Sequence, residues 1–91
     1  MAISVKIPTP LRKLTDGVST VNVEGHNIEK IISNLELEYP GISERLCDEN
    51  GQLRAFVNIF VNGEDIRYLS GMESVIADGD EISIVPAVAG G

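Results

Sequence analysis

One stretch of this chain has the hydrophobic period of a helix, and the stretches on both sides have the period of strands. Four apolar residues occur at i, i+3, i+4 and i+7, which places Ile28, Ile31, Ile32 and Leu35 on one stripe of a helix. Asn27 is the predicted N-terminal cap, with His26 as the alternative, because its side chain can accept a hydrogen bond from a free backbone amide. Pro40-Gly41 ends the helix, since the residue before proline is driven out of the helical region.

The segments around this helix alternate between apolar and polar residues every second position. Residues 2–8 place Ile3, Val5 and Ile7 on one face, and prolines follow directly. Turn signals at Asp16-Gly17, Asn62-Gly63 and Asp78-Gly79-Asp80 separate the extended segments. We expect strands over residues 2–8, 21–25, 56–61, 65–67 and 81–85, a further helical turn over 42–47 and a loop over 48–54. The first two strands are expected to form an antiparallel hairpin with a connection longer than a tight turn.

This order of elements predicts one α+β domain. Ninety-one residues are enough for a single core. One helix of about four turns can cover one face of one mixed sheet, which gives two layers. With the helix crossing over between the second and third strands, the arrangement is a ubiquitin-like β-grasp, with a mixed sheet of four to five strands packed on one main helix. The domain is expected to span residues 1–86, followed by a flexible tail over 87–91.

The segment 56–61 does not alternate cleanly, because it is apolar at every position except Asn58. Either the strand is central and covered on both faces, or its second face meets a partner. If Ile82 and Ile84 point toward the helix, strand parity turns Val85 outward. Either Phe60 or Val61 is then also outward. Phe60 and Val85 are therefore candidates for a docking surface, and the alternative for Phe60 is an ordinary core position.

Composition excludes several classes of function. Seven basic residues face fourteen acidic ones, a net charge of −7, which argues against nucleic-acid binding. The acidic surface favours a basic protein partner, or serves only solubility. A lone cysteine, Cys47, and a lone histidine, His26, permit neither a disulfide nor a Cys/His metal cage within one chain. The absence of a long apolar run or a charged signal region predicts a soluble, cytoplasmic protein without a membrane span.

No catalytic motif is present, so we do not expect an enzyme. The sequence has no phosphate-binding glycine loop, no nucleophile elbow and no His-Glu-x-x-His. Asp48 and Glu49 would disfavour a thiolate at Cys47, which predicts a packing role for that residue. His26 is expected to be exposed at the start of the helix.

The carboxyl terminus is the remaining place for chemistry. Pro86 to Gly91 could extend about 20 Å. Val88 and Ala89 are slender, and Gly90 and Gly91 lack β-carbons, so this tail could thread a narrow channel in another protein. A free carboxylate at Gly91 is unreactive until it is activated. ATP can convert it to an acyl-adenylate, and a sulfur nucleophile can then displace AMP to give a thioester or a terminal thiocarboxylate.

The stretches "FVNIFVNGEDIR" and "DGDEISIVPAVAGG" resemble the MoaD/ThiS-type β-grasp sulfur carrier proteins, and the resemblance covers essentially the whole chain. The stretch "YPGISERL" and the "VPAVAGG" ending are most similar to the CysO-type branch, which supplies sulfur for cysteine biosynthesis.

The resemblance implies a set of partners. A ubiquitin-activating-like adenylyltransferase would use ATP to adenylate Gly91, and a sulfur donor would then make the thiocarboxylate. In the cysteine branch a pyridoxal-phosphate-dependent synthase accepts the sulfur, and a JAMM-type zinc metalloprotease releases cysteine from the carrier. In related branches the acceptor belongs to molybdopterin or thiazole synthesis. None of these cofactors would be bound by this chain.

Further predictions concern the surface around the tail and the alternative functions of the tail. Apolar residues of the uncovered sheet face, Phe60 and Val85 here, are implied to contact the activating enzyme. Arg67 or Arg54 would hold the tail or pair with the partner, unless each is simply a solvated charge. The alternative function is a ubiquitin-like modifier joined through Gly91 to lysines of target proteins, and a third reading is a binding module whose tail has no role.

Overall fold

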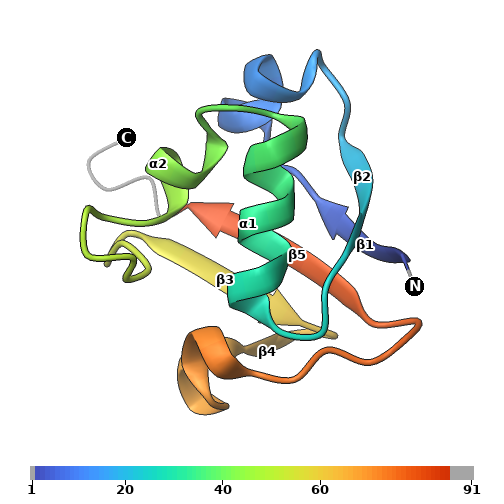
Figure 1. Ribbon diagram of the computed structural model, residues 1–91, viewed down its shortest axis with the longest axis vertical. Helices are drawn as coiled ribbons and strands as arrows, with labels where there is room; N and C mark the ends of the chain where they lie inside the picture. The colour runs from blue at the N-terminus through green and yellow to red at the C-terminus, as the bar shows by residue number, and fades with distance from the viewer. Residues whose placement is uncertain (1, 87–91) are drawn as a thin grey trace.

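The alternating segments assemble into one five-stranded mixed sheet. The computed structural model describes residues 2–86. The strands are β1 (Ala2–Lys6), β2 (Thr20–Glu24), β3 (Val57–Val61), β4 (Glu64–Asp65) and β5 (Glu81–Pro86), in the spatial order β2-β1-β5-β3-β4. β1 is antiparallel to β2 and parallel to β5, whereas β3 is antiparallel to both β5 and β4. Figure 1 shows this sheet behind the helices. The predicted mixed sheet and the β-grasp arrangement are confirmed.

The main helix, α1 (Ile28–Glu38), begins and ends where its sequence predicts. The Asn27 side chain accepts a hydrogen bond from the Lys30 amide at 2.8 Å, so Asn27 is the cap and not His26. The helix stops at Glu38, two residues before Pro40. After Gly41 the expected additional turn forms as α2 (Ile42–Leu46), with Ile42 and Leu46 fully buried.

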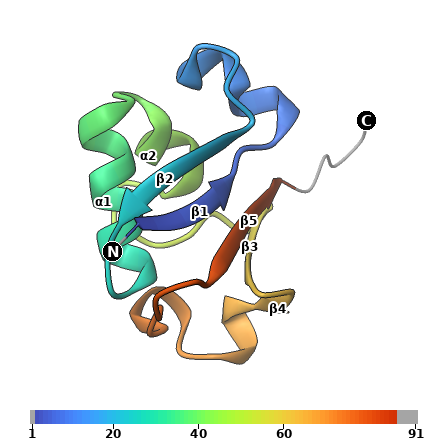
Figure 2. The ribbon, with the colours of Figure 1, turned by 90° about the vertical axis from the view of Figure 1, so that its right-hand side faces the viewer.

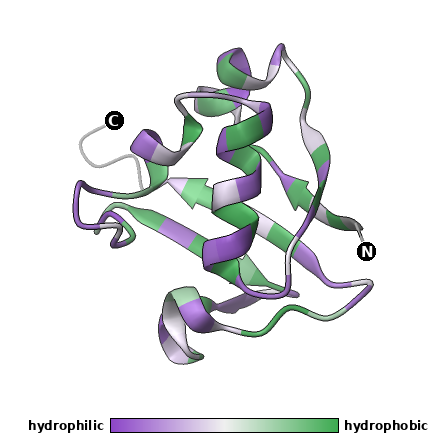
Figure 3. Ribbon diagram, viewed as in Figure 1, coloured by the Kyte–Doolittle hydropathy of each residue, from purple (hydrophilic) through white to green (hydrophobic). Residues whose placement is uncertain are grey.

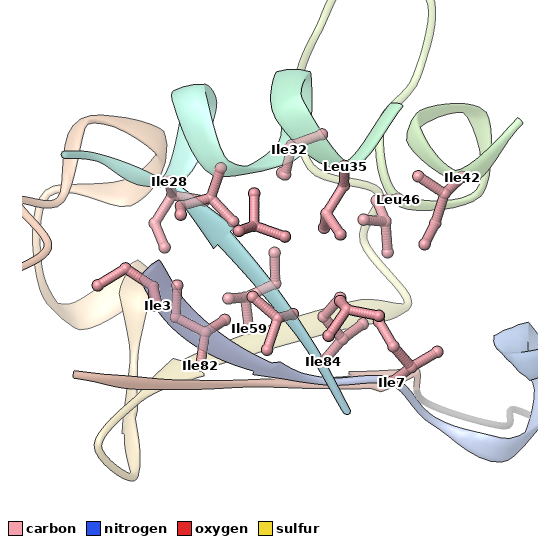
Figure 4. Packing of buried hydrophobic residues seen from close by; sticks show 14 of the residues in the cluster. Ile3, Ile7, Ile28, Ile32, Leu35, Ile42, Leu46, Ile59, Ile82 and Ile84 are labelled. Atoms are coloured by element: carbon pink, nitrogen blue, oxygen red, sulfur yellow. The ribbon is translucent and has the colours of Figure 1, made fainter. Parts of the chain in front are cut away.

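The core lies between this helical layer and one face of the sheet. Each apolar residue of the α1 stripe is at most 5% exposed, and the same holds for the inward residues of β1 and β5. Figure 4 shows Ile28, Ile32 and Leu35 of α1 directed toward Ile59, Ile82 and Ile84 of the sheet, with the two buried α2 side chains beside them. Colouring by hydropathy shows the same alternation of apolar and polar positions along α1 and the strands (Figure 3). Burial of this apolar surface is the main favourable contribution to folding.

The connection between β1 and β2 contains a 3₁₀ helix, Thr9–Thr15, that the alternation did not predict. Pro8 precedes it, and a proline in its first turn has no amide to leave unpaired. Leu11 and Thr15 are buried, and the Arg12 Nε donates to the carbonyl of Ile7 at 3.0 Å. The hairpin itself is confirmed by the antiparallel pairing of β1 with β2.

The tight turn between β3 and β4 forms as expected, but the chain after it does not remain extended. Asn62 and Gly63 both have positive φ, at 52° and 88°, as a two-residue hairpin turn of type I′ requires. The prediction of a strand over 65–67 is wrong beyond Asp65, because Ile66–Tyr68 forms a 3₁₀ helix. The Asp65 carboxylate caps this helix by accepting a hydrogen bond from the Arg67 amide at 2.8 Å.

The turn before β5 is fixed by Asp80. Its carboxylate accepts hydrogen bonds from the amide of Ala77 and the side chain of Asn62, at 2.8 and 2.9 Å. The Asn62 amide in turn donates to the carbonyl of Glu81. These bonds tie the start of β5 to the β3–β4 turn and set the register of the two strands.

The second face of the sheet carries no helix within residues 2–86. Figure 2, turned by 90°, shows α1 and α2 together on one side of the sheet. In β3, Val57, Ile59 and Val61 are buried, whereas Asn58 and Phe60 are half-buried. Burial therefore alternates although hydrophobicity does not, and of the two residues left open by the sequence Phe60 faces outward. None of the helices in this part of the chain is long and apolar enough to cross a bilayer.

Candidate functional site

The candidate site begins at the end of β5, which leads out of the described residues. Val85 pairs with Asn58 and Pro86 pairs with Val57. The Asn62–Glu81 hydrogen bond fixes the alternation of this ladder, so Asn58 and Val85 form a hydrogen-bonded pair and Val57 and Pro86 a non-hydrogen-bonded one. Pro86 therefore turns its missing amide away from β3, toward the side where the pairing of β1 with β5 has already ended at Lys6–Ser83. This position tolerates proline inside a strand.

The two apolar docking candidates lie together on the uncovered face. Val85 is 44% exposed on β5, and Phe60 is half-buried on the neighbouring strand. Phe60 pairs with Ser83, so Phe60 and Val85 are diagonal neighbours across the ladder. The structure thus brings both predicted residues onto one surface beside the end of β5. Their role in docking remains a prediction.

Arg67 reaches the same region from the 3₁₀ helix after β4. It is exposed, as expected of a surface charge, but its guanidinium is not simply solvated. Nη1 donates to Asn58 Oδ1 at 2.6 Å, and Nη2 donates to the carbonyls of Val57 and Arg54 at 2.7 and 3.0 Å. Arg54, the other arginine considered, donates from Nε to the carbonyl of Glu44 at 2.9 Å. Both arginines are therefore bonded to their own chain.

Other exposed side chains lie on the same elements or next to them. Lys6 and Glu81 form an ion pair at 3.2 Å on β1 and β5, with both side chains about half exposed. Phe56, just before β3, is 51% exposed, and Tyr68, next to Arg67, is 87% exposed. Neither of these aromatic residues was a predicted site residue. Their exposure depends on where β3 begins and β4 ends, which hydrophobic alternation alone does not define.

The helical face of the described residues carries a hollow. A hollow of about 800 Å³ is lined by Ile32, Glu36, Cys47, Arg54 and Met72, among others. The Glu36 carboxylate accepts hydrogen bonds from the amides of Gly41 and Ser43, which hold its pKa below the ordinary value. Burial, and then the charge of Asp48, raise the pKa of the Cys47 thiol, so the expected unfavourable thiolate is confirmed, with burial as the larger cause. Among residues 2–86 no three metal-ligating side chains cluster.

The remaining predicted residues fall elsewhere. His26 is exposed just before α1, as expected. Val88, Ala89, Gly90 and Gly91 lie outside the described residues, so their roles as threading tail and reactive carboxylate remain predictions.

Known proteins with this sequence pattern and fold are carriers and modifiers. The chain is 50% identical to the sulfur carrier protein CysO of Mycobacterium tuberculosis over 93 aligned residues that cover all of both chains. It is similar to the CysO of Amycolatopsis orientalis, solved in a complex with BexX, with a TM-score of 0.93, 43% identity, and coverage of 99% of this chain and 100% of that one.

A modifier is also among the similar structures. The small archaeal modifier protein 1 of Methanosarcina acetivorans matches with a TM-score of 0.84 and 31% identity, over 99% of this chain and 96% of that one. The family model described as the ThiS family matches residues 5–91, nearly the whole length, and includes the β5 end and the residues beyond it. This protein therefore belongs to the ThiS family.

Proposed function

We propose that this protein is a sulfur carrier that presents Gly91 to partner enzymes, most closely in the manner of the CysO branch. The observation that carries the proposal is the 50% identity, over full length, to a protein named as the sulfur carrier CysO. The geometry supports it, because β5 leads the chain out of the sheet directly beside an uncovered face with two apolar side chains. The protein itself is a substrate in this proposal, and its partners carry out the chemistry.

The proposed chemistry has two steps. In an adenylyltransferase related to ubiquitin-activating enzymes, a Gly91 carboxylate oxygen attacks the α-phosphorus of ATP and pyrophosphate leaves. A sulfide-equivalent donor then attacks the acyl carbon, the C–O bond to AMP breaks, and a proton is released as the thiocarboxylate forms. The acceptor enzyme would be a pyridoxal-phosphate-dependent cysteine synthase, the leading choice over a molybdopterin or thiazole synthase. There the thiocarboxylate sulfur would form a C–S bond to a serine-derived acceptor, so that the new cysteine remains joined to Gly91. A JAMM-type zinc metalloprotease in the cytoplasm would then hydrolyse the bond to Gly91, which releases cysteine and restores the carboxylate.

The fold contributes presentation and docking in this scheme. The BexX/CysO complex supports the idea that a CysO-type carrier works while seated on a second protein. The net charge of −7 would favour encounter with a basic surface. Pro86 is the last residue of β5, and the proposed tether to the partner's active site is the segment 87–91.

Intact-mass measurement tests this function. The full-length protein is incubated with an activating enzyme, ATP and a sulfur donor, and we expect a gain of about 16 Da as sulfur replaces oxygen. Deletion of Gly91 should abolish the gain while leaving thermal unfolding unchanged. An equal gain in the deletion variant, or none in the wild type, would contradict the proposal.

The second candidate function is protein modification through Gly91. The similarity to a small archaeal modifier protein favours it. The same adenylate would then be captured by a lysine amine, giving isopeptide-linked adducts on other proteins. Tryptic mapping of native lysates for Gly-Gly-modified lysines distinguishes this function from sulfur transfer.

A further inference from the structure

The outer edge of β3 is covered by β4 over only part of its length. β4 pairs Asp65 with Phe60 and Glu64 with Val61, and the chain then turns into a 3₁₀ helix. The first three residues of β3, Val57 to Ile59, therefore have no strand partner on that side among the described residues. Unpaired backbone groups at such an edge need other partners.

Arg67 supplies the partner of the Val57 carbonyl, and the Val57 amide donates to the carbonyl of Arg54. If β4 continued, its register would place residue 67 opposite Asn58, and the Arg67 guanidinium occupies this position in place of a strand. Its three donor bonds, at 2.6–3.0 Å, end on the Asn58 side chain and on the carbonyls of Val57 and Arg54. The backbone of Arg67 is itself anchored by the Asp65 carboxylate. A planar guanidinium can satisfy several acceptors at once, whereas a lysine ammonium is a single point charge.

The two residues that Arg67 holds are the two that hold the end of β5. Asn58 pairs with Val85, and Val57 pairs with Pro86. On the other side of β5, the pairing with β1 has already ended at Ser83. The last three residues of β5, Ile84 to Pro86, thus pair with β3 alone, and Arg67 binds the outer side of the first two residues of β3. We propose that Arg67 is a positioning residue for sulfur-carrier activation, because it fixes the point from which the reactive tail departs.

The effect of Arg67 on activation rests on the proposed function, whereas the contacts of Arg67 with β3 do not depend on it. If the Val85 and Pro86 pairs open, these two residues join the segment that leads to Gly91 and lengthen the proposed tether by two residues. A longer and freer tether lowers the effective concentration of the Gly91 carboxylate in the active site of a docked partner. Arg67 would then affect turnover after docking and leave the docking affinity itself nearly unchanged.

The first test uses the full-length protein alone. Arg67→Ala should speed hydrogen exchange at the amides of Asn58 and Val85 by about tenfold relative to wild type, with the next hydrogen-bonded pair of the ladder, Phe60 and Ser83, unchanged. Arg45→Ala is the matched control, because Arg45 is an exposed arginine on α2 and its loss changes the net charge equally. Unchanged exchange at Val85 in Arg67→Ala would overturn the inference that Arg67 holds the end of β5 in place. Arg67→Lys should recover little of the protection, and full recovery would attribute the effect to charge and overturn the three-acceptor geometry.

The second test measures ATP-dependent pyrophosphate release by the activating enzyme. We expect kcat to fall about tenfold for Arg67→Ala, while KM for the carrier stays within about twofold. A raised KM with unchanged kcat would overturn the positioning role and make Arg67 a direct partner contact. If the wild type itself is not adenylated, the proposed function fails and the positioning role fails with it. Hydrogen exchange still decides whether Arg67 holds the end of β5 in place.

Discussion

Alanine substitutions of two adjacent residues at the end of β5 should distinguish an effect on folding stability from an effect on docking. Ile84 is 4% exposed and faces the core, whereas Val85 is 44% exposed and faces the uncovered side of the sheet. Truncation of each to alanine tests whether these two faces have different roles. The substitutions are one residue apart on the same strand, so differences in strand propensity are small beside the difference in burial.

The expected magnitudes follow from the burial of each side chain. Ile84→Ala removes three buried carbons and leaves a cavity, which costs about 3 kcal/mol of unfolding free energy. Val85→Ala removes two methyl groups that are a little over half buried, which costs about 0.9 kcal/mol. At about 4–8 °C per kcal/mol for a domain of this size, Tm should fall by about 12–24 °C for Ile84→Ala and about 4–7 °C for Val85→Ala.

The assay pairs urea unfolding with adenylation kinetics under conditions in which each variant is folded. Val85→Ala should raise KM for the carrier about 5–30-fold, as expected for a half-exposed apolar contact worth 1–2 kcal/mol at an interface. Ile84→Val costs only about 1 kcal/mol and serves as the folded core control. It should leave KM unchanged.

Two results would refute this reasoning. Equal destabilisation by Val85→Ala and Ile84→Ala would mean that Val85 is a core residue and that the second sheet face is covered. An unchanged KM for Val85→Ala would mean that the uncovered face beside the tail is not the docking surface.

Two further predictions concern the supports of α1. Asn27→Ala should lower the unfolding free energy by about 1 kcal/mol, because it removes the cap on the Lys30 amide, whereas the exposed Asn22→Ala should have almost no effect; urea midpoints compare them. Glu36 has a lowered pKa in the folded state, so its charged form contributes stability above the ordinary value of 4.5 that is lost as pH falls through the lowered pKa. Wild type should therefore exceed Glu36→Gln in urea midpoint at pH 7, and the gap should narrow as the pH falls below 4.5 through the lowered pKa; a gap independent of pH would contradict this origin.

The sequence predicts the features that local residues determine. The helix stripe, the Asn27 cap and the Asn62-Gly63 turn each depend on residues within about one turn of chain, and all form as expected. The inward and outward residues of β5 also follow from parity alone. In each case a short-range steric or hydrogen-bonding rule is sufficient.

The features that were missed depend on distant contacts. The 3₁₀ helix Thr9–Thr15 is stabilised by burial of Leu11 against the core and by the bond from Arg12 to Ile7, which no periodicity encodes. The end of β4 depends on competition between the sheet ladder and the Asp65 cap, and the sequence favours neither outright. Arg67 could not be assigned its partners without the register of β3, because Asn58 is nine residues away along the chain.

The end of the sheet nearest the tail is held on fewer sides than its middle, and this follows from where each strand stops. Ile82 and Ser83 pair with β1 on one side and with β3 on the other, whereas Ile84, Val85 and Pro86 pair with β3 alone. Beyond β3 itself, a single side chain, Arg67, takes the place of the missing strand. If Phe60 and Val85 are the docking surface, a partner seated on them lies directly beside the last described residues of β5, which is the placement that the proposed activation of Gly91 needs.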